Sequence, residues 1–192
     1  MNRDEAWAIL CEYTKGEPLR KHGLAVEAAM RAYARKFGED EEMFGIVGLL
    51  HDFDYEMHPN AVEHPKKGAP ILREKGVPEE IVHAVLCHAF YLEDLGVQRE
   101  NNMDRAIFAV DELTGFITAV ALVKPGKSID EVDVKSVRKK MKEKGFARAV
   151  RREDITDGAD VLGVDLDQHI AFCIEALKPV AAQLGIAGTA AV

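Results

Sequence analysis

The stretch GIVGLLHDFDYEMHP, residues 45–59, joins an apolar run to a group of polar side chains. The run ends in the adjacent pair His51 and Asp52, and a further carboxylate, Asp54, follows two residues later. The apolar spacing before the pair predicts a buried helix over about residues 39–52. An imidazole beside a carboxylate at such a helix end is either a simple end contact or part of a metal site in a dry pocket.

Composition predicts one domain over residues 1–192. A chain of 192 residues with 47% hydrophobic content is long enough to bury one core. We expect a metal-site core at about residues 18–123, with basic and C-terminal helices over residues 124–186. The N-terminus carries acidic residues where an export signal needs a basic start, and the most apolar stretch, residues 106–123, contains two carboxylates. Neither export nor a membrane span is therefore predicted, and a cytoplasmic location is expected.

The charge is distributed unevenly along the chain. A net charge of −8 argues against general nucleic-acid binding. Residues 124–152 nevertheless hold eleven Lys or Arg and four Asp or Glu, a net charge of +7 that leaves −15 for the rest. This segment either attracts an anionic substrate or forms a solvated helix face.

The cysteines do not follow a metal or disulfide pattern. Cys11, Cys87 and Cys173 are odd in number, far apart and without CxxC spacing. Neither a disulfide framework nor a thiolate zinc site is therefore predicted. We interpret all three as buried thiols.

Helix signals dominate, so the fold is predicted to be all-α. Pro18 suits the first turn of a helix that Gly38 ends, and the apolar spacing between them puts His22 on the inner face. A long helix is predicted over residues 103–123, and its inner face includes Asp111.

Shorter helices are predicted from their end signals. Pro65 and Pro78 are typical of helix starts and Gly76 of a stop, which gives two short helices. The second of these places His88 on its inner stripe and turns His83 toward solvent. The motif SIDE, residues 128–131, resembles a capping box that opens the basic helix, and DLDQ, residues 165–168, opens the last helix.

Four polar residues occupy positions where the pattern calls for apolar ones. Singly, each is explained as a hydrogen-bonded core histidine or a helix cap. Together they imply a divalent cation, because an unpaired carboxylate in a dry core costs several kcal/mol. Nitrogen and oxygen donors suit Mn, Fe, Co, Ni, Zn or Mg, without selecting among them. The four are His22, His51, Asp52 and Asp111.

The ordered set resembles the H…HD…D signature of the HD-domain superfamily of metal-dependent phosphohydrolases. Within it the chain is most similar to the HDIG-type branch and HD-GYP domains, because HPKKGAPIL, residues 64–72, resembles their HPxxGxxIL segment. The sequence also departs from that branch. HDFD replaces HDIG, Tyr55 stands where the fuller motif has lysine, Cys87 replaces one of two histidines, and no GYP motif follows.

The resemblance implies a helical bundle and one or two divalent metal ions. The first ion is expected on His22, His51, Asp52 and Asp111. His64 and His88 are the expected ligands of a second ion, with Asp52 as the bridge.

The expected activity is hydrolysis of a small phosphorylated substrate. Asp52 or Asp54 is expected to accept a proton from water that the metal activates. Lysines and one arginine are expected to contact phosphate. Taken singly, each is also explained as an ordinary surface residue. They are Lys66, Lys67, Lys124, Lys127, Lys135, Arg138 and Lys139.

Three other interpretations remain open from the sequence. The same ligands suit a di-iron oxygenase. The altered HDFD motif also suits a metal-loaded module that senses a nucleotide with little turnover. The third is a helical scaffold protein without a functional site, in which the core histidines are simply hydrogen-bonded. The sequence does not identify the substrate, the metal or the oligomeric state.

Overall fold

Helices account for 67% of the chain, and the part described by the computed structural model, residues 1–60 and 63–188, contains no strand. Within it an isolated antiparallel bridge joins Ser128 to Ala187. The all-α prediction is therefore confirmed. The helices are α1 (Arg3–Tyr13), α2 (Glu17–Phe37), α3 (Glu41–Leu50), α4 (Gly68–Glu74), α5 (Glu79–Cys87), α6 (Leu92–Leu95), α7 (Asn102–Leu122), η1 (Ile129–Glu131), α8 (Val134–Met141), α9 (Arg152–Leu162), α10 (Leu166–Leu177), η2 (Lys178–Val180) and α11 (Ala181–Leu184).

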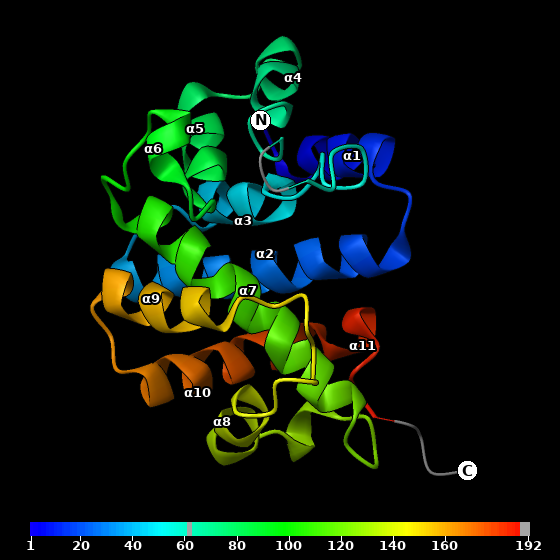
Figure 1. Cartoon of the computed structure of the whole chain (residues 1–192). Coiled ribbons are helices and arrows are strands. Elements are labelled where there is room, and N and C mark those ends of the chain that lie inside the picture. Colours follow the sequence, from blue (N-terminus) through cyan, green and yellow to red (C-terminus); the bar gives the residue numbers. More distant parts are fainter. Residues whose placement is uncertain (61–62, 189–192) are drawn as a thin grey trace.

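The two longest helices, α2 and α7, form the centre of the bundle. Helix α2 packs against α3, α7, α10 and α11, whereas α7 packs against α5, α8, α9 and α10. In Figure 1 the helices α1 and α3–α6 lie above α2, and α8, α10 and α11 lie below it. A continuous cluster of buried apolar side chains runs through these layers, from Ala6 to Ile186.

Helix α2 begins and ends as predicted. Pro18 lies in its first turn, and Gly38 ends it in the left-handed conformation with φ 71°. Helix α3 lies unusually close to α2, because a Cβ atom at Gly48 would sit only 2.8 Å from the Glu27 Cα atom. Since glycine alone permits this approach, it brings the C-terminal end of α3 close to α2, the helix that carries His22.

One predicted helix start, Pro65, is wrong. The Lys67 amide donates to the Glu63 carbonyl at 2.8 Å, which closes a turn across Pro65, and α4 begins only at Gly68. Pro78 is the N-cap of α5, and Gly76 follows the end of α4 with φ 75°.

The start of the basic helix is also corrected. Ser128 caps only the short turn η1, whereas α8 begins at Val134 after a capping box between Asp133 and Ser136. That box accounts for the shift, because it satisfies the first free amides of α8. Asp165 does cap α10 by accepting from the Gln168 amide, but α10 is followed by α11 and is not the last helix.

No helix in the described part of the chain combines the length and apolar character needed to span a membrane.

Candidate metal centre

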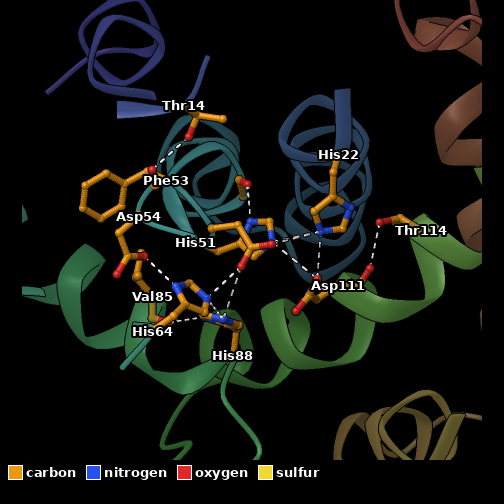
Figure 2. Close-up of polar contacts among 12 residues, drawn as sticks. Thr14, His22, His51, Phe53, Asp54, His64, Val85, His88, Asp111 and Thr114 are labelled. Carbon is orange, nitrogen blue, oxygen red and sulfur yellow. Dashed lines mark hydrogen bonds and ion pairs between the residues drawn. The ribbon is translucent and has the colours of Figure 1, made fainter. Parts of the chain in front are cut away.

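Side chains from α2, from the residues that follow α3 and from α7 point toward one another (Figure 2). His22 Nε2 lies 3.0 Å from Asp111 Oδ1 and 3.2 Å from His51 Nε2. Asp52 Oδ2 lies 3.7 Å from His22 Nε2 and 3.6 Å from His51 Nε2. The four donor atoms lie within 4.8 Å of one another, so they could hold one metal ion.

A second donor group lies on the other side of Asp52. His64 Nε2 is 2.8 Å from Asp52 Oδ1 and 2.9 Å from His88 Nε2, and His88 Nε2 is 3.7 Å from the same Asp52 oxygen. These three residues form a further set that could hold a metal ion. Asp52 therefore presents one carboxylate oxygen to each group, as a ligand that bridges two ions would.

Hydrogen bonds at Nδ1 fix the orientation of three of the imidazoles. His51 Nδ1 donates to the Gly48 carbonyl at 2.8 Å, and His88 Nδ1 donates to the Val85 carbonyl at 2.5 Å. His64 Nδ1 lies 2.6 Å from Asp54 Oδ1 (Figure 2). Each ring is thus held through Nδ1 and directs Nε2 toward a donor group, which is the usual arrangement around metal-binding histidines.

Asp54 lies behind His64 and is completely buried. It does not line the cavity described below, so its position does not fit the proton-accepting role expected from the sequence. A Cβ atom at Gly68 would lie 2.5 Å from the Asp54 carboxylate, so this glycine leaves room for that carboxylate. Asp54 is placed to orient His64 and to increase its basicity as a ligand.

Burial and neighbouring charges shift the pKa values of the ionisable groups at the centre. Burial opposes protonation of His51, but Asp52 and Asp111 outweigh it and raise its pKa to about 9. Burial disfavours the Asp52 and Asp111 carboxylates, yet the neighbouring histidines hold both pKa values well below the usual range. For His88, burial and the nearby His64 lower the pKa to about 4. The centre thus combines ionised carboxylates with a neutral imidazole, a donor set suited to a divalent cation.

A cavity of about 400 Å³ opens onto these donors. Its floor includes His22, Asp52, His64, His88 and Asp111. The walls are mainly apolar and aromatic, with three charged residues among them. They are formed by Leu19, Tyr55, Ala89, Phe90, Tyr91, Phe108, Glu112, Gly115, Ala149, Val150, Arg151 and Asp154.

Four polar wall residues, Tyr91, Glu112, Arg151 and Asp154, were not identified from the sequence. Burial and the neighbouring Asp111 raise the pKa of Glu112 to about 8. Arg151 lies 2.8 Å from Asp154, and the Tyr91 hydroxyl is buried with no hydrogen-bond partner. Glu112 follows Asp111 directly and Arg151 belongs to the +7 segment, so the sequence contained a weak signal for both.

The lysines expected to contact phosphate do not line the cavity. Lys66 and Lys67 are exposed outside the cavity lining, and Lys67 Nζ pairs with Glu63 at 2.5 Å. Arg138 lies 3.3 Å from Asp167, and Lys127 is exposed. A separate surface groove, which shares no lining residue with the cavity, is bordered by Lys124, Lys135, Lys139 and Lys140. The +7 segment thus contributes Arg151 to the cavity, not its lysines.

The cysteine prediction is correct for two of the three thiols. Cys87 and Cys173 are buried, whereas Cys11 is only partly buried because it lies near the chain surface on α1. Cys87 faces away from the metal centre, toward His83 and Asp104. His83 is also less solvated than expected, because its side chain is only 28% exposed and contacts the Gln98 carbonyl.

Comparison with protein families supports the same assignment as the geometry. The family model described as the HD domain matches residues 19–115, which span α2 to α7 and contain all six residues of the two donor groups. HD domains bind divalent metal ions and are generally metal-dependent hydrolases. No curated protein and no solved structure matches the chain. Because the family model covers half of the sequence, this chain belongs to the HD-domain family.

Proposed function

We propose that this protein is a metal-dependent phosphohydrolase that acts on a phosphate ester, a nucleotide or a related small molecule. The observation that carries the proposal is the position of Asp52, which offers one oxygen to each of two donor groups at the floor of an open cavity. Two cations held about 3.5–4 Å apart in this way are typical of phosphate-cleaving centres. The HPKKGAPIL segment supports an origin near the HDIG-type branch.

In this proposal His22, His51, Asp52 and Asp111 hold one cation, and Asp52, His64 and His88 hold the other. A bound divalent ion supplies Lewis acidity toward a phosphoryl oxygen and toward water. Asp54 keeps the His64 ring in place through its 2.6 Å contact. Asp52 belongs to both groups and lines the cavity, and its low pKa keeps it ionised.

The cavity wall supplies the remaining functions. Arg151 faces the cavity as the cation for a phosphate group, and the apolar rings of Phe90, Tyr91 and Phe108 form a surface for a base or another planar group. Glu112, with its raised pKa, is placed to donate a proton to the leaving oxygen.

The test is a panel of phosphomonoesters, phosphodiesters and dinucleoside polyphosphates, assayed with Mn²⁺, Mg²⁺, Co²⁺ and Ni²⁺ on protein of known metal content. Hydrolysis of at least one substrate, lost in Asp52→Ala, is expected. Failure of every phosphate compound with metal-loaded protein would refute the proposal. Oxygen consumption with iron-loaded protein would point to an oxygenase, and tight nucleotide binding without turnover would point to a sensing module.

A further inference from the structure

A separate cluster of metal-binding side chains lies outside the cavity. His83 and Cys87 are one helical turn apart on α5, and Asp104 lies in the first turn of α7. One donor atom from each lies within 4.8 Å of the other two, and the backbone carbonyl of Gln98 also points into this cluster. None of these residues lines the cavity at the metal centre.

We propose that His83, Cys87 and Asp104, with the Gln98 carbonyl, form a structural zinc site. His83 Nε2 lies 3.5 Å from Cys87 Sγ, 3.4 Å from Asp104 Oδ2 and 3.1 Å from Gln98 O. Cys87 Sγ lies 3.4 Å from Gln98 O. Zinc bonds of about 2.0 Å to nitrogen or oxygen and 2.3 Å to sulfur place tetrahedral donors about 3.3–3.6 Å apart. The three separations that involve Cys87 or Asp104, at 3.4–3.5 Å, fall within this range, and the distance from His83 Nε2 to Gln98 O is 0.2 Å below it.

The geometry argues against a catalytic thiol in this cluster. In a nucleophile–histidine–acid relay, one ring nitrogen contacts the nucleophile and the other contacts the carboxylate. Here Cys87 Sγ and Asp104 Oδ2 both approach the same nitrogen, Nε2 of His83. Cys87 is also fully buried, so no substrate reaches its thiol. Convergence on one point is what a metal ion requires.

The environment of Asp104 points independently to a ligand. Its side chain is completely buried, and Oδ2 accepts from the amides of Glu100 and Asn101 at 3.0 and 3.4 Å. The other oxygen, Oδ1, is buried without a hydrogen-bond partner. A buried carboxylate oxygen left unpaired is costly. A cation bound at Oδ2 would offset part of the cost of burying this carboxylate, and a thiolate, a carboxylate and a neutral imidazole balance the charge of one Zn²⁺ ion.

The site would connect three parts of the chain. It joins the end of α5, the loop at Gln98 and the start of α7. His88 follows Cys87 directly, so a zinc ion here would fix the segment that carries His88 into the metal centre. Cys87 would then serve this site and not the metal centre.

Cobalt provides a direct test, because a thiolate bound to Co²⁺ gives a charge-transfer absorption band in the near ultraviolet. The donors at the metal centre are nitrogen and oxygen only, so they do not produce this band. We expect the band in Co²⁺-loaded wild-type protein, and its loss in both Cys87→Ser and His83→Ala. Zinc-loaded forms of both variants should also contain about one ion per chain less than the wild type.

Cys173→Ser is the matched control, because Cys173 is a buried thiol 3.8 Å from His169 with no carboxylate in the group. The cobalt charge-transfer band of this variant should be the same as that of the wild type. His83 is partly exposed, so His83→Ala tests the site even where a change at buried Cys87 impairs folding. Absence of the band in the wild type, or its survival in either variant, would overturn the proposal.

Discussion

The Nε2 atom of His64 lies 2.8 Å from Oδ1 of Asp52, while the other oxygen of that carboxylate faces His22 and His51. Asp52 is thus the one residue shared by the two donor groups. Two groups that share a carboxylate cannot be altered independently at that position. A substitution at Asp52 should therefore affect metal binding in both groups, whereas a substitution of another ligand should affect only its own group.

Asp52→Asn should remove bound metal from both groups. The amide keeps the size of the side chain but loses the charge that balances the cations. The holo protein should lose the stabilisation that metal supplies, about 2.7 kcal/mol when the free metal is at 100 times its Kd. Elemental analysis and thermal unfolding with and without added Mn²⁺ check this. A variant that keeps the wild-type metal content would contradict the shared-ligand assignment.

Replacing both His64 and His88 with Ala should remove only the second ion. The first group keeps its four donors, so the metal content should fall by about one ion per chain. Asp54→Asn is a second test, because it removes a charged partner of His64 without removing a ligand. It should lower the affinity for the second ion by about 10–100-fold. An unchanged stoichiometry in the double variant would leave these histidines as substrate contacts or core residues.

Metal affinity should rise with pH. Despite burial, Asp52 and Asp54 raise the pKa of His64 to about 10, and carboxylates raise that of His51 to about 9. Below these values each imidazole holds a proton that the metal must displace, so binding weakens as pH falls, by up to about tenfold per unit for each proton released. Calorimetric titration with Mn²⁺ between pH 6 and 9, in buffers of different ionisation enthalpy, measures Kd and proton release together. A constant Kd without proton release would contradict this.

The long helices and the inward histidines were predictable because they depend on local patterns. Apolar spacing and end residues locate α2 and α7, and the same spacing puts His22 and Asp111 on inner faces. The wall of the cavity was not predictable, because it depends on tertiary packing. Arg152 donates to the carbonyls of Glu143, Phe146 and Val150 among others, and these contacts hold the segment that brings Arg151 to the cavity.

The cluster around Cys87 was also not predictable from the sequence. His83 and Cys87 have the spacing of metal ligands on a helix, but Asp104 comes from another helix and Gln98 contributes a backbone atom. No spacing rule applied to one segment connects them. Only the packing of α5 against α7 does.

Glu112→Gln should impair cleavage of esters that have a poor leaving group. Glutamine cannot protonate the departing oxygen, so kcat for an alkyl phosphate should fall by about 100-fold or more. An ester of p-nitrophenol needs no such proton and should be much less affected. The ratio of kcat values for the two substrates, in wild type and variant, is the measurement. Equal losses on both substrates would assign Glu112 a structural role.

Arg151→Ala should weaken binding of an anionic substrate. The guanidinium lies over the Phe90 ring, 3.8 Å from its centroid, and is tied to Asp154, so it faces the cavity in a fixed position. A charged hydrogen bond to phosphate contributes about 1.5–3 kcal/mol, which corresponds to a rise in KM of about tenfold or more. Since the substrate makes this contact before and during the reaction, kcat should change less than KM.

The double variant Lys135→Glu, Lys139→Glu is the control for charge alone. It removes more positive charge than Arg151→Ala does, but both lysines border the separate groove near α8. Its KM at physiological salt should stay close to the wild-type value, because neither lysine lines the cavity and salt screens exposed charges over a Debye length of about 8 Å. If the lysine variant raises KM as much as Arg151→Ala, the substrate is attracted by the net charge of the segment. Arg151 would then have no specific role as a phosphate contact.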